Sequence, residues 1–304
     1  MDPIICIVGP TASGKSSLAQ SVALRLDGEV VSADSMQIYR GMDIGTGKVL
    51  PNERLVRHHC LDIVDPGEPY SVALFQKHAR QSFEEISNRG KRAILCGGTG
   101  FYIRAAIDAY DFPKGEQANN PIREAYWAYR DENGTEALWL LLKDKDPASA
   151  AIIPENDVKR VIRAFELLEE GTSYAEQKER LANIPQLLPA RLCGLMVDPK
   201  LLAKRIDARV DNMVEDGLVD EVKGLLNKGF REGITSPQAI GYKEIVEYLD
   251  GSCTLDEALD AVKLATRRYA KRQRTWFRKD KRITWIDADD LDVERMTDEV
   301  LSLI

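Results

Sequence analysis

Eight residues near the start of the chain constrain its fold more strongly than any other stretch. Residues 9–16, which read "GPTASGKS", fit the pattern G-x-x-x-x-G-K-[ST]. They follow "IICIVG" (4–9), which is short and apolar throughout, and run into "KSSLAQSVALRL" (15–26), which has helical spacing. A glycine-rich turn between a buried strand and a helix is the context that this pattern requires. We therefore expect a parallel α/β sheet with a phosphate-binding loop after its first strand.

The residue types of this loop suit the binding of a phosphate. Successive backbone N–H groups and the start of the following helix can surround the anion, and Lys15 adds a positive charge. The hydroxyl of Ser16 can hold Mg²⁺. The candidate phosphate-binding residues are Gly9, Thr11, Ala12, Ser13, Gly14, Lys15 and Ser16. The pattern predicts a phosphoanhydride ligand and leaves the organic half of that ligand open.

The rest of the chain predicts a sheet interrupted by a helical insertion. Four more strand patterns occur, at 29–34, 91–98, 192–198 and 282–288. From about 112 to 190 only helical spacing is found. We expect an α/β core formed by 1–111 and 191–304, with an all-helical insertion at 112–190. Later in the core, helices are expected at 199–217, 237–250 and 255–279.

Cysteine spacing and hydropathy argue against secretion and membrane insertion. The five cysteines are widely spaced and form no Cys-x-x-Cys pair, which favours reduced thiols over disulfides or a zinc site. The first strand begins almost at once, without a secretion signal, and no run of 18 apolar residues occurs. No heptad repeat is present. We expect a cytoplasmic monomer with no membrane contact and no obligate protein partner.

Basic residues are gathered in an otherwise acidic chain. The net charge is −7, yet residues 267–282 carry nine basic side chains and one acidic side chain. One face of the helix predicted there holds Arg267, Lys271, Arg274 and Arg278. The opposite side would hold Leu259, Val262, Ala265, Tyr269 and Trp276. A second basic face, in the insertion, consists of Lys159, Arg160 and Arg163. One charged face is usually only solvated, but two on an acidic protein favour the binding of a nucleic acid.

Further side chains are candidates for chemistry beside the phosphate. Asp34 ends the strand at 29–34, and it reads equally as a base or as an acid that caps a helix or organises magnesium. Thr99, in "GGTG", could donate to a phosphate while its glycines admit the backbone closely, or it could cap a tight turn. Arg205 and Arg209 lie on one helix face and could close over a phosphate, although their spacing alone favours a solvated face.

Together these motifs resemble one family, the tRNA dimethylallyltransferases, also called tRNA isopentenyltransferases. Eight segments carry the resemblance in family order: "GPTASGKSSLA", "SADSMQIYRGMDIGTGK", "HHCLDIVDP", "GGTGFYIRA", "ENDVKRVIRAFEL", "RIDARVDNMVEDGLVDEV", "QAIGYKEIVEYL" and "RRYAKRQRTWFR". The resemblance implies transfer of a dimethylallyl group from dimethylallyl diphosphate to the exocyclic amine of the adenine 3′-adjacent to the anticodon in tRNA. The loop at 9–16 would then hold the diphosphate leaving group, with Mg²⁺ as the cofactor.

The same resemblance implies roles for individual residues. Lys15 and Arg209 would stabilise the diphosphate, and Asp34 would act as general base toward the adenine amine. Thr99 would contact the leaving-group oxygens, and Ser16 would hold the metal. The implied contacts to the anticodon stem-loop of tRNA are Asp34, Ser35, Met36, Gln37, Thr99, Arg123, Lys159, Arg160, Arg163, Gly241, Lys243, Arg267, Lys271, Arg274 and Arg278.

Some features depart from the family pattern or suit other proteins. An Ala-Asp-Pro run is common before the residue that matches Arg123, whereas this chain reads "ANNPIR", and Lys159 stands where many members have glutamine. The chain ends at 304 without the zinc-finger tail of many eukaryotic members, which indicates the bacterial type. A P-loop small-molecule kinase would share the loop, the acid and the arginines, but it leaves the basic face at 267–278 unexplained. A nucleotide-gated RNA-binding module would need no acid and threonine beside the loop.

Overall fold

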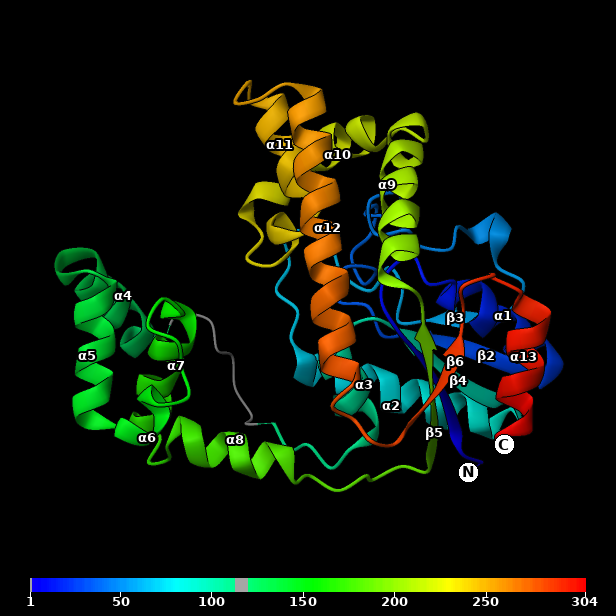
Figure 1. Cartoon of the computed structure of the whole chain (residues 1–304), viewed down its shortest axis with the longest axis horizontal. Helices are drawn as coiled ribbons and strands as arrows, with labels where there is room; N and C mark the ends of the chain where they lie inside the picture. Colours follow the sequence, from blue (N-terminus) through cyan, green and yellow to red (C-terminus); the bar gives the residue numbers. More distant parts are fainter. Residues whose placement is uncertain (1, 113–119) are drawn as a thin grey trace. The chain divides into compact units, whose positions relative to one another are not determined.

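The computed structural model describes residues 2–112 and 120–304, which belong to two compact units (Figure 1). The larger unit consists of Met1–Asp108 and Gln186–Ile304, and the smaller, helical unit is Ala109–Pro185. The first part of the expected insertion, including the start of "ANNPIR", lies outside the described residues.

Six parallel strands form the sheet of the larger unit, which confirms the predicted fold class (Figure 1). They are β1 (Ile4–Val8), β2 (Gly28–Ser32), β3 (His58–His59), β4 (Arg92–Gly97), β5 (Ala190–Met196) and β6 (Ile283–Asp287). Their spatial order is β3-β2-β4-β1-β5-β6. All five predicted strands are present, although β5 begins and ends two residues earlier than expected. The two residues of β3 escape prediction because so short a segment shows no periodic pattern.

Eight α-helices belong to the described residues of the larger unit. They are α1 (Lys15–Arg25), α2 (Val72–Asn88), α3 (Gly100–Ile107), α9 (Pro199–Glu215), α10 (Leu218–Leu226), α11 (Tyr242–Leu249), α12 (Leu255–Phe277) and α13 (Val293–Ser302). The start of α9 is as predicted, because the Asp198 side chain caps it by accepting the N–H groups of Lys200 and Leu201. The helix expected at 237–250 is shorter, since Gly241, with φ of 93°, separates α11 from a short 3₁₀ turn.

The inner strands are buried on both faces of the sheet. On β1, Ile4, Cys6 and Val8 pack in one apolar cluster with residues of α2 and α3. Ile5 and Ile7 point to the other face and pack with residues of α1, α9 and α13. This double burial explains why the strand reads as a continuous apolar run instead of an alternating one.

A third apolar cluster anchors the segment that follows β2. Ile38, Tyr39 and Met42 are buried there together with Val222 of α10 and Tyr242 of α11. The cluster holds this segment, which has no strand or α-helix of its own, against the helices that follow α9.

The helical unit has its own small core. Its helices are α4 (Pro121–Asn133), α5 (Thr135–Lys145), α6 (Pro147–Ala150), α7 (Val158–Glu169) and α8 (Tyr174–Ala182). Leu138, Leu142 and Val161 pack around Phe165, whose ring stacks on Tyr126 with the centroids 3.9 Å apart. As predicted, this unit is helical in the part of it that the structure describes.

Candidate active site

The segments after three strands meet around a cavity at the carboxyl edge of the sheet. Val8 of β1 pairs with Gly97 of β4, and Ser32 of β2 pairs with Cys96, so the chain leaves these strands side by side. With α9 and α12 the segments line a cavity of about 930 Å³, where parallel α/β sheets bind ligands. Of the predicted site residues, the lining includes Thr11, Ala12, Ser13, Gly14, Lys15, Ser16, Asp34, Ser35, Met36, Gln37, Arg209 and Gly241.

Hydrogen bonds between its own residues stabilise the phosphate-binding loop. Both Nζ of Lys15 and the hydroxyl of Ser13 donate to the carbonyl oxygen of Pro10, at 2.5 Å and 2.8 Å. Burial lowers the pKa of Lys15 to about 8, while the negative charge of Asp34 acts in the opposite direction. The charge of Asp34 therefore acts on Lys15, and both residues border the cavity.

Asp34 and Thr99 belong to two turns that are tied together. One carboxylate oxygen of Asp34 accepts the N–H of Met36 at 2.9 Å, so this acid caps its own turn. The Thr99 hydroxyl accepts the N–H of Ser35 at 3.2 Å. Thr99 is the N-cap residue of α3 but makes no side-chain capping bond to that helix. Its hydroxyl instead connects the end of β4 to the residue that follows Asp34.

The glycines beside Thr99 make room for α12. A Cβ atom on Gly98 would lie 2.2 Å from Nε2 of Gln273, and one on Gly100 would lie 2.0 Å from Cδ1 of Trp276. Packed atoms do not approach so closely. These glycines therefore admit the side chains of α12. Gly98 also borders the cavity, and the expectation that the glycines let a phosphate approach the backbone stays a prediction.

The two arginines of α9 have different surroundings. Arg205 donates to the backbone carbonyl oxygens of Ala288, at 3.0 Å, and of Asp289, so it fastens α9 to the segment after β6. Arg209 borders the cavity and lies 3.5 Å from the carbonyl oxygen of Thr46. Burial lowers the pKa of Arg209, and the charge of Asp34 opposes this shift. Only the second arginine of the pair is therefore available to an anion in the cavity.

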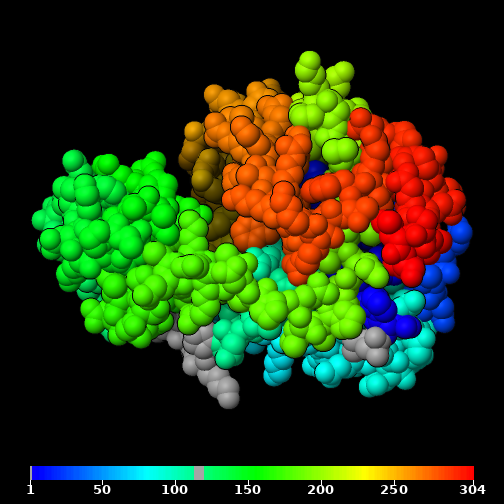
Figure 2. Space-filling view, turned by 60° about the horizontal axis from the view of Figure 1, so that its bottom comes forward, coloured from blue at the N-terminus to red at the C-terminus, as the bar shows by residue number. Residues whose placement is uncertain are grey.

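The basic side of α12 lies on the surface of the larger unit (orange in Figure 2). Arg267, Lys271 and Arg278 are exposed, and Arg274 is half-buried. Arg267 also pairs with Asp207 of α9, at 2.8 Å. These exposures suit the predicted contacts to a polyanion, although Arg267 already has a carboxylate partner.

The buried side of α12 differs from the prediction. Trp276, expected to be buried, is 45% exposed where it covers Gly100. The residues that are buried are Ala258, Val262, Ala270, Gln273 and Phe277. The prediction missed Gln273 because a polar side chain is not expected in an apolar stripe.

On α7, the predicted basic face is partly engaged in ion pairs. Glu166 is 1% exposed and binds Arg123 at 2.6 Å and Arg163 at 2.9 Å. Burial would raise the pKa of Glu166, but the two guanidinium groups hold it below its usual value. Arg160 pairs with Asp157 at 2.5 Å, and Lys159 is exposed.

Two further predicted contacts lie at the start of α11. The N–H of Gly241 donates to the carboxylate of Glu244 at 2.8 Å, and Gly241 borders the cavity. Lys243 is about half exposed and lies 3.8 Å from Glu247. Gly241 thus belongs to the cavity wall, whereas Lys243 belongs to the surface.

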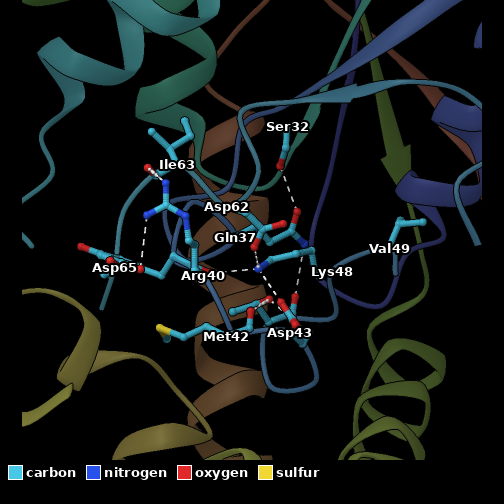
Figure 3. A network of polar contacts seen from close by, with 12 residues as sticks. Ser32, Gln37, Arg40, Met42, Asp43, Lys48, Val49, Asp62, Ile63 and Asp65 are labelled. Carbon is cyan, nitrogen blue, oxygen red and sulfur yellow. Dashed lines mark hydrogen bonds and ion pairs between the residues drawn. The ribbon is translucent and has the colours of Figure 1, made fainter. Parts of the chain in front are cut away.

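A buried lysine that the sequence analysis did not single out organises the segment 43–48. The Lys48 side chain is 1% exposed, and its Nζ donates to the carboxylates of Asp43 at 2.5 Å and Asp62 at 2.6 Å (Figure 3). It also donates to the carbonyl oxygen of Tyr39 at 2.9 Å. A buried cation is tolerated only with such partners. Lys48 therefore joins the cavity wall to the segment that follows β3.

The same segment supports two residues of the cavity. Nε2 of Gln37 donates to the carbonyl oxygen of Thr46 at 3.3 Å, and this oxygen is also the partner of Arg209. On the outer side of the segment, Glu221 of α10 accepts the N–H groups of Asp43 and Ile44, at 3.0 Å and 2.8 Å. The orientations of Gln37 and Arg209 thus depend on how this segment is held.

Three further findings concern the described residues as a whole. No helix within 2–112 and 120–304 is long and apolar enough to cross a bilayer. The described residues contain no group of three or more His, Cys, Asp or Glu side chains that could hold a metal ion. All five cysteines are free thiols, and four of them are buried, as the sequence led us to expect.

A parallel sheet with a glycine-rich loop, a lysine and a helix start at its carboxyl edge defines a P-loop α/β protein. Comparison with known proteins narrows this class. The family model described as IPP transferase matches residues 37–280, and the model described as isopentenyl transferase matches residues 3–59.

Known relatives are similar along the whole chain. The tRNA dimethylallyltransferase of Carboxydothermus hydrogenoformans is 48% identical, over 99% of this chain and 97% of its own. The solved tRNA isopentenylpyrophosphate transferase of Bacillus halodurans is 43% identical with a TM-score of 0.72, and the match covers 99% of this chain and 95% of that one. A eukaryotic dimethylallyltransferase acting on tRNA gives 27% identity and a TM-score of 0.80, covering 99% and 80%. The chain belongs to the tRNA dimethylallyltransferase family and is an enzyme of the prenyltransferase class.

Proposed function

We propose that the protein transfers a dimethylallyl group from dimethylallyl diphosphate to the exocyclic amine of the adenine 3′-adjacent to the anticodon in tRNA. The product is N6-dimethylallyladenosine. The observation that carries the proposal is that the loop at 9–16, Asp34 and Arg209 border one and the same cavity in a member of this family. A tRNA substrate also makes the cytoplasm the proposed location.

The loop at 9–16 is proposed to hold the diphosphate while it acts as the leaving group. The allylic C–O bond breaks and its electron pair stays on the diphosphate, so the step is limited by negative charge on that group. Backbone N–H groups at the start of α1 and the charge of Lys15 face this anion. Arg209 would close on it from α9, with its guanidinium held beside the carbonyl oxygen of Thr46.

Asp34 is proposed as the general base. The new C–N bond forms at the adenine amine, which is weakly basic, and one amine proton passes to the carboxylate. The bond from the N–H of Met36 fixes one carboxylate oxygen and thereby orients the group. Because Thr99 binds the N–H of Ser35, the turn that carries Asp34 is held from two sides.

Magnesium is the proposed cofactor, and Ser16 is the residue that would hold it. Ser16 is exposed at the cavity, and Mg²⁺ usually combines few protein ligands with phosphate oxygens and water, so the residues fit the metal. When bound there, the ion supplies positive charge to the diphosphate oxygens. Lys15 and Arg209 contribute charge from the protein itself.

The proposed contacts to the anticodon stem-loop lie on several elements. The turn from Asp34 to Gln37 would hold the target nucleotide, while basic residues of α12 and α7 would contact the phosphate backbone. Lys271 and Arg278 on α12 and Lys159 on α7 are exposed, as such contacts require.

Incubation with unmodified tRNA, Mg²⁺ and radiolabelled dimethylallyl diphosphate tests the proposal, with label counted in precipitated RNA. Asp34→Asn keeps an oxygen for the N–H of Met36 but removes the base, so its transfer rate should fall by roughly 10²-fold or more. Its affinity for tRNA should stay near that of the wild type. Turnover of ATP without label in RNA would instead favour a kinase, and full transfer by Asp34→Asn would remove Asp34 as the base.

A further inference from the structure

Gln273 of α12 joins two parts of the cavity wall that lie far apart in the sequence. Its side chain is 5% exposed. Oε1 accepts the N–H of Thr11, in the phosphate-binding loop, at 2.9 Å. Nε2 donates to the carbonyl oxygen of Gly98, at the end of β4, at 3.0 Å. One amide group therefore links the loop after β1 to the turn after β4.

The position requires an amide of this length. An amide offers an acceptor and a donor at the two ends of one planar group, as the N–H of Thr11 and the carbonyl of Gly98 demand. Gly98 has no Cβ atom, which leaves the space that Nε2 occupies. A carboxylate would keep the first bond and lose the second, and an aliphatic side chain would lose both.

Tyr269, one helical turn earlier, extends this link toward Asp34. Tyr269 borders the same cavity as Gln273 and Asp34. Burial and the charge of Asp34 raise the pKa of Tyr269 to about 12, while Thr99 and Gln273 act in the opposite direction, so the phenol is neutral at physiological pH. Thr99 in turn accepts the N–H of Ser35. The inner side of α12 thus contacts the loop for the diphosphate and the turn after β4, and Thr99 of that turn is bonded to the turn for the proposed base.

The outer side of the same helical turns carries cations. Lys271 is two residues before Gln273, so it projects about 160° away from it around the helix axis. Arg274 follows Gln273 and is half-buried next to a small cavity of about 220 Å³. An anion bound to the outer side of α12 would therefore restrain the turn that holds Gln273.

We propose that Gln273 is a positioning residue that couples RNA binding on the outer side of α12 to diphosphate binding in the loop at 9–16. This inference rests on the proposed function. RNA bound to Lys271 and Arg274 holds α12, and Gln273 then keeps Thr11 and Gly98 in one arrangement. The diphosphate meets a loop that has already lost conformational freedom, so it binds more tightly. By linkage, the diphosphate tightens RNA binding by the same factor.

Calorimetric titration with inorganic diphosphate and Mg²⁺, with and without an unmodified anticodon stem-loop RNA, tests this coupling. In the wild type, RNA should tighten diphosphate binding by about fivefold or more. In Gln273→Leu this factor should fall below about twofold, while the affinity for RNA alone stays near the wild-type value. The matched control is Gln81→Leu, which removes an exposed glutamine of α2 and should keep the full coupling.

Gln273→Glu is a second variant, which keeps the test valid if Gln273→Leu does not fold. It is isosteric and retains the acceptor for Thr11, so it should fold and show a coupling factor between the other two. An unchanged factor in both variants, or no coupling in the wild type, would overturn the inference. The radiolabel assay on the same wild-type sample separates the two proposals, because transfer without coupling refutes only the role of Gln273, whereas absence of transfer refutes the proposed function.

Discussion

Two helices with the same sequence pattern, α7 and α12, use their buried polar residue in different ways. Each has a basic face and an apolar face, and each buries one polar side chain. On α7 this is Glu166, which binds Arg123 and Arg163 of its own unit. On α12 it is Gln273, which binds backbone groups of Thr11 and Gly98. A basic amphipathic helix can therefore stabilise its own unit or connect a surface to a site, and its buried polar residue distinguishes the two cases.

The largest effect is expected from removing the buried charge of α7. Glu166→Gln leaves two guanidinium groups without their carboxylate and should lower the free energy of unfolding of the helical unit by about 3 kcal/mol. The melting transition of that unit should then fall by roughly 10 °C or more in calorimetry. Glu169→Gln, an exposed change on the same helix, is the control. An unchanged transition would mean that Arg123 and Arg163 are not structural, which would erase the contrast with α12.

A smaller effect is expected on the surface of α12. Lys271→Ala combined with Arg274→Ala should raise the Michaelis constant for tRNA about tenfold and reduce the slope of log affinity against log salt by about 2. Lys159→Ala combined with Arg160→Ala should act more weakly, because Arg160 already pairs with Asp157. Filter binding over a salt series measures both. Equal losses from the two helices would contradict the difference proposed between them.

An effect of at most the same size is expected from pH, which separates the loop from α12. The pKa of Lys15 is about 8, so its charge is present at pH 7 and largely lost at pH 9. Diphosphate affinity of the free protein should therefore fall by about tenfold over this range. Arginines of α12 stay charged, so RNA affinity should change much less. Lys15→Met should lack the fall in diphosphate affinity, and a fall of the same size in that variant would exclude Lys15 as its cause.

Patterns within short segments predicted much of the fold. The loop at 9–16, the strands on either side of the insertion and the cap of α9 at Asp198 depend on neighbouring residues, so periodicity and turn chemistry reveal them. The strand β3 escaped prediction because it has only two residues. Trp276 was misassigned because helical spacing predicts a face but not how far the neighbouring elements cover it.

Some residues of the candidate site could be predicted from local sequence patterns, and others depend on packing between distant segments. Lys15 and Asp34 follow strands, so a parallel sheet brings them to one edge and a sequence reader can expect them there. Arg205 and Arg209 look equivalent in the sequence, and they differ only because the segment after β6 lies beside one and the cavity beside the other. No sequence pattern singles out Lys48, because its carboxylate partners Asp43 and Asp62 lie beside it only once β2, β3 and the segment 43–48 are packed together.

The amino-acid sequence sufficed to predict the parallel sheet, the phosphate-binding loop and the two basic helices, because the patterns that reveal them lie within short segments. The assembled fold was needed to show which buried groups those helices hold and what the glycines of "GGTG" accommodate. Thr11 and Gln273 are 262 residues apart, and a hydrogen bond over that separation leaves no periodic trace in the chain. Their contact exists because the sheet order sets β4 beside β1 and α12 crosses the ends of both.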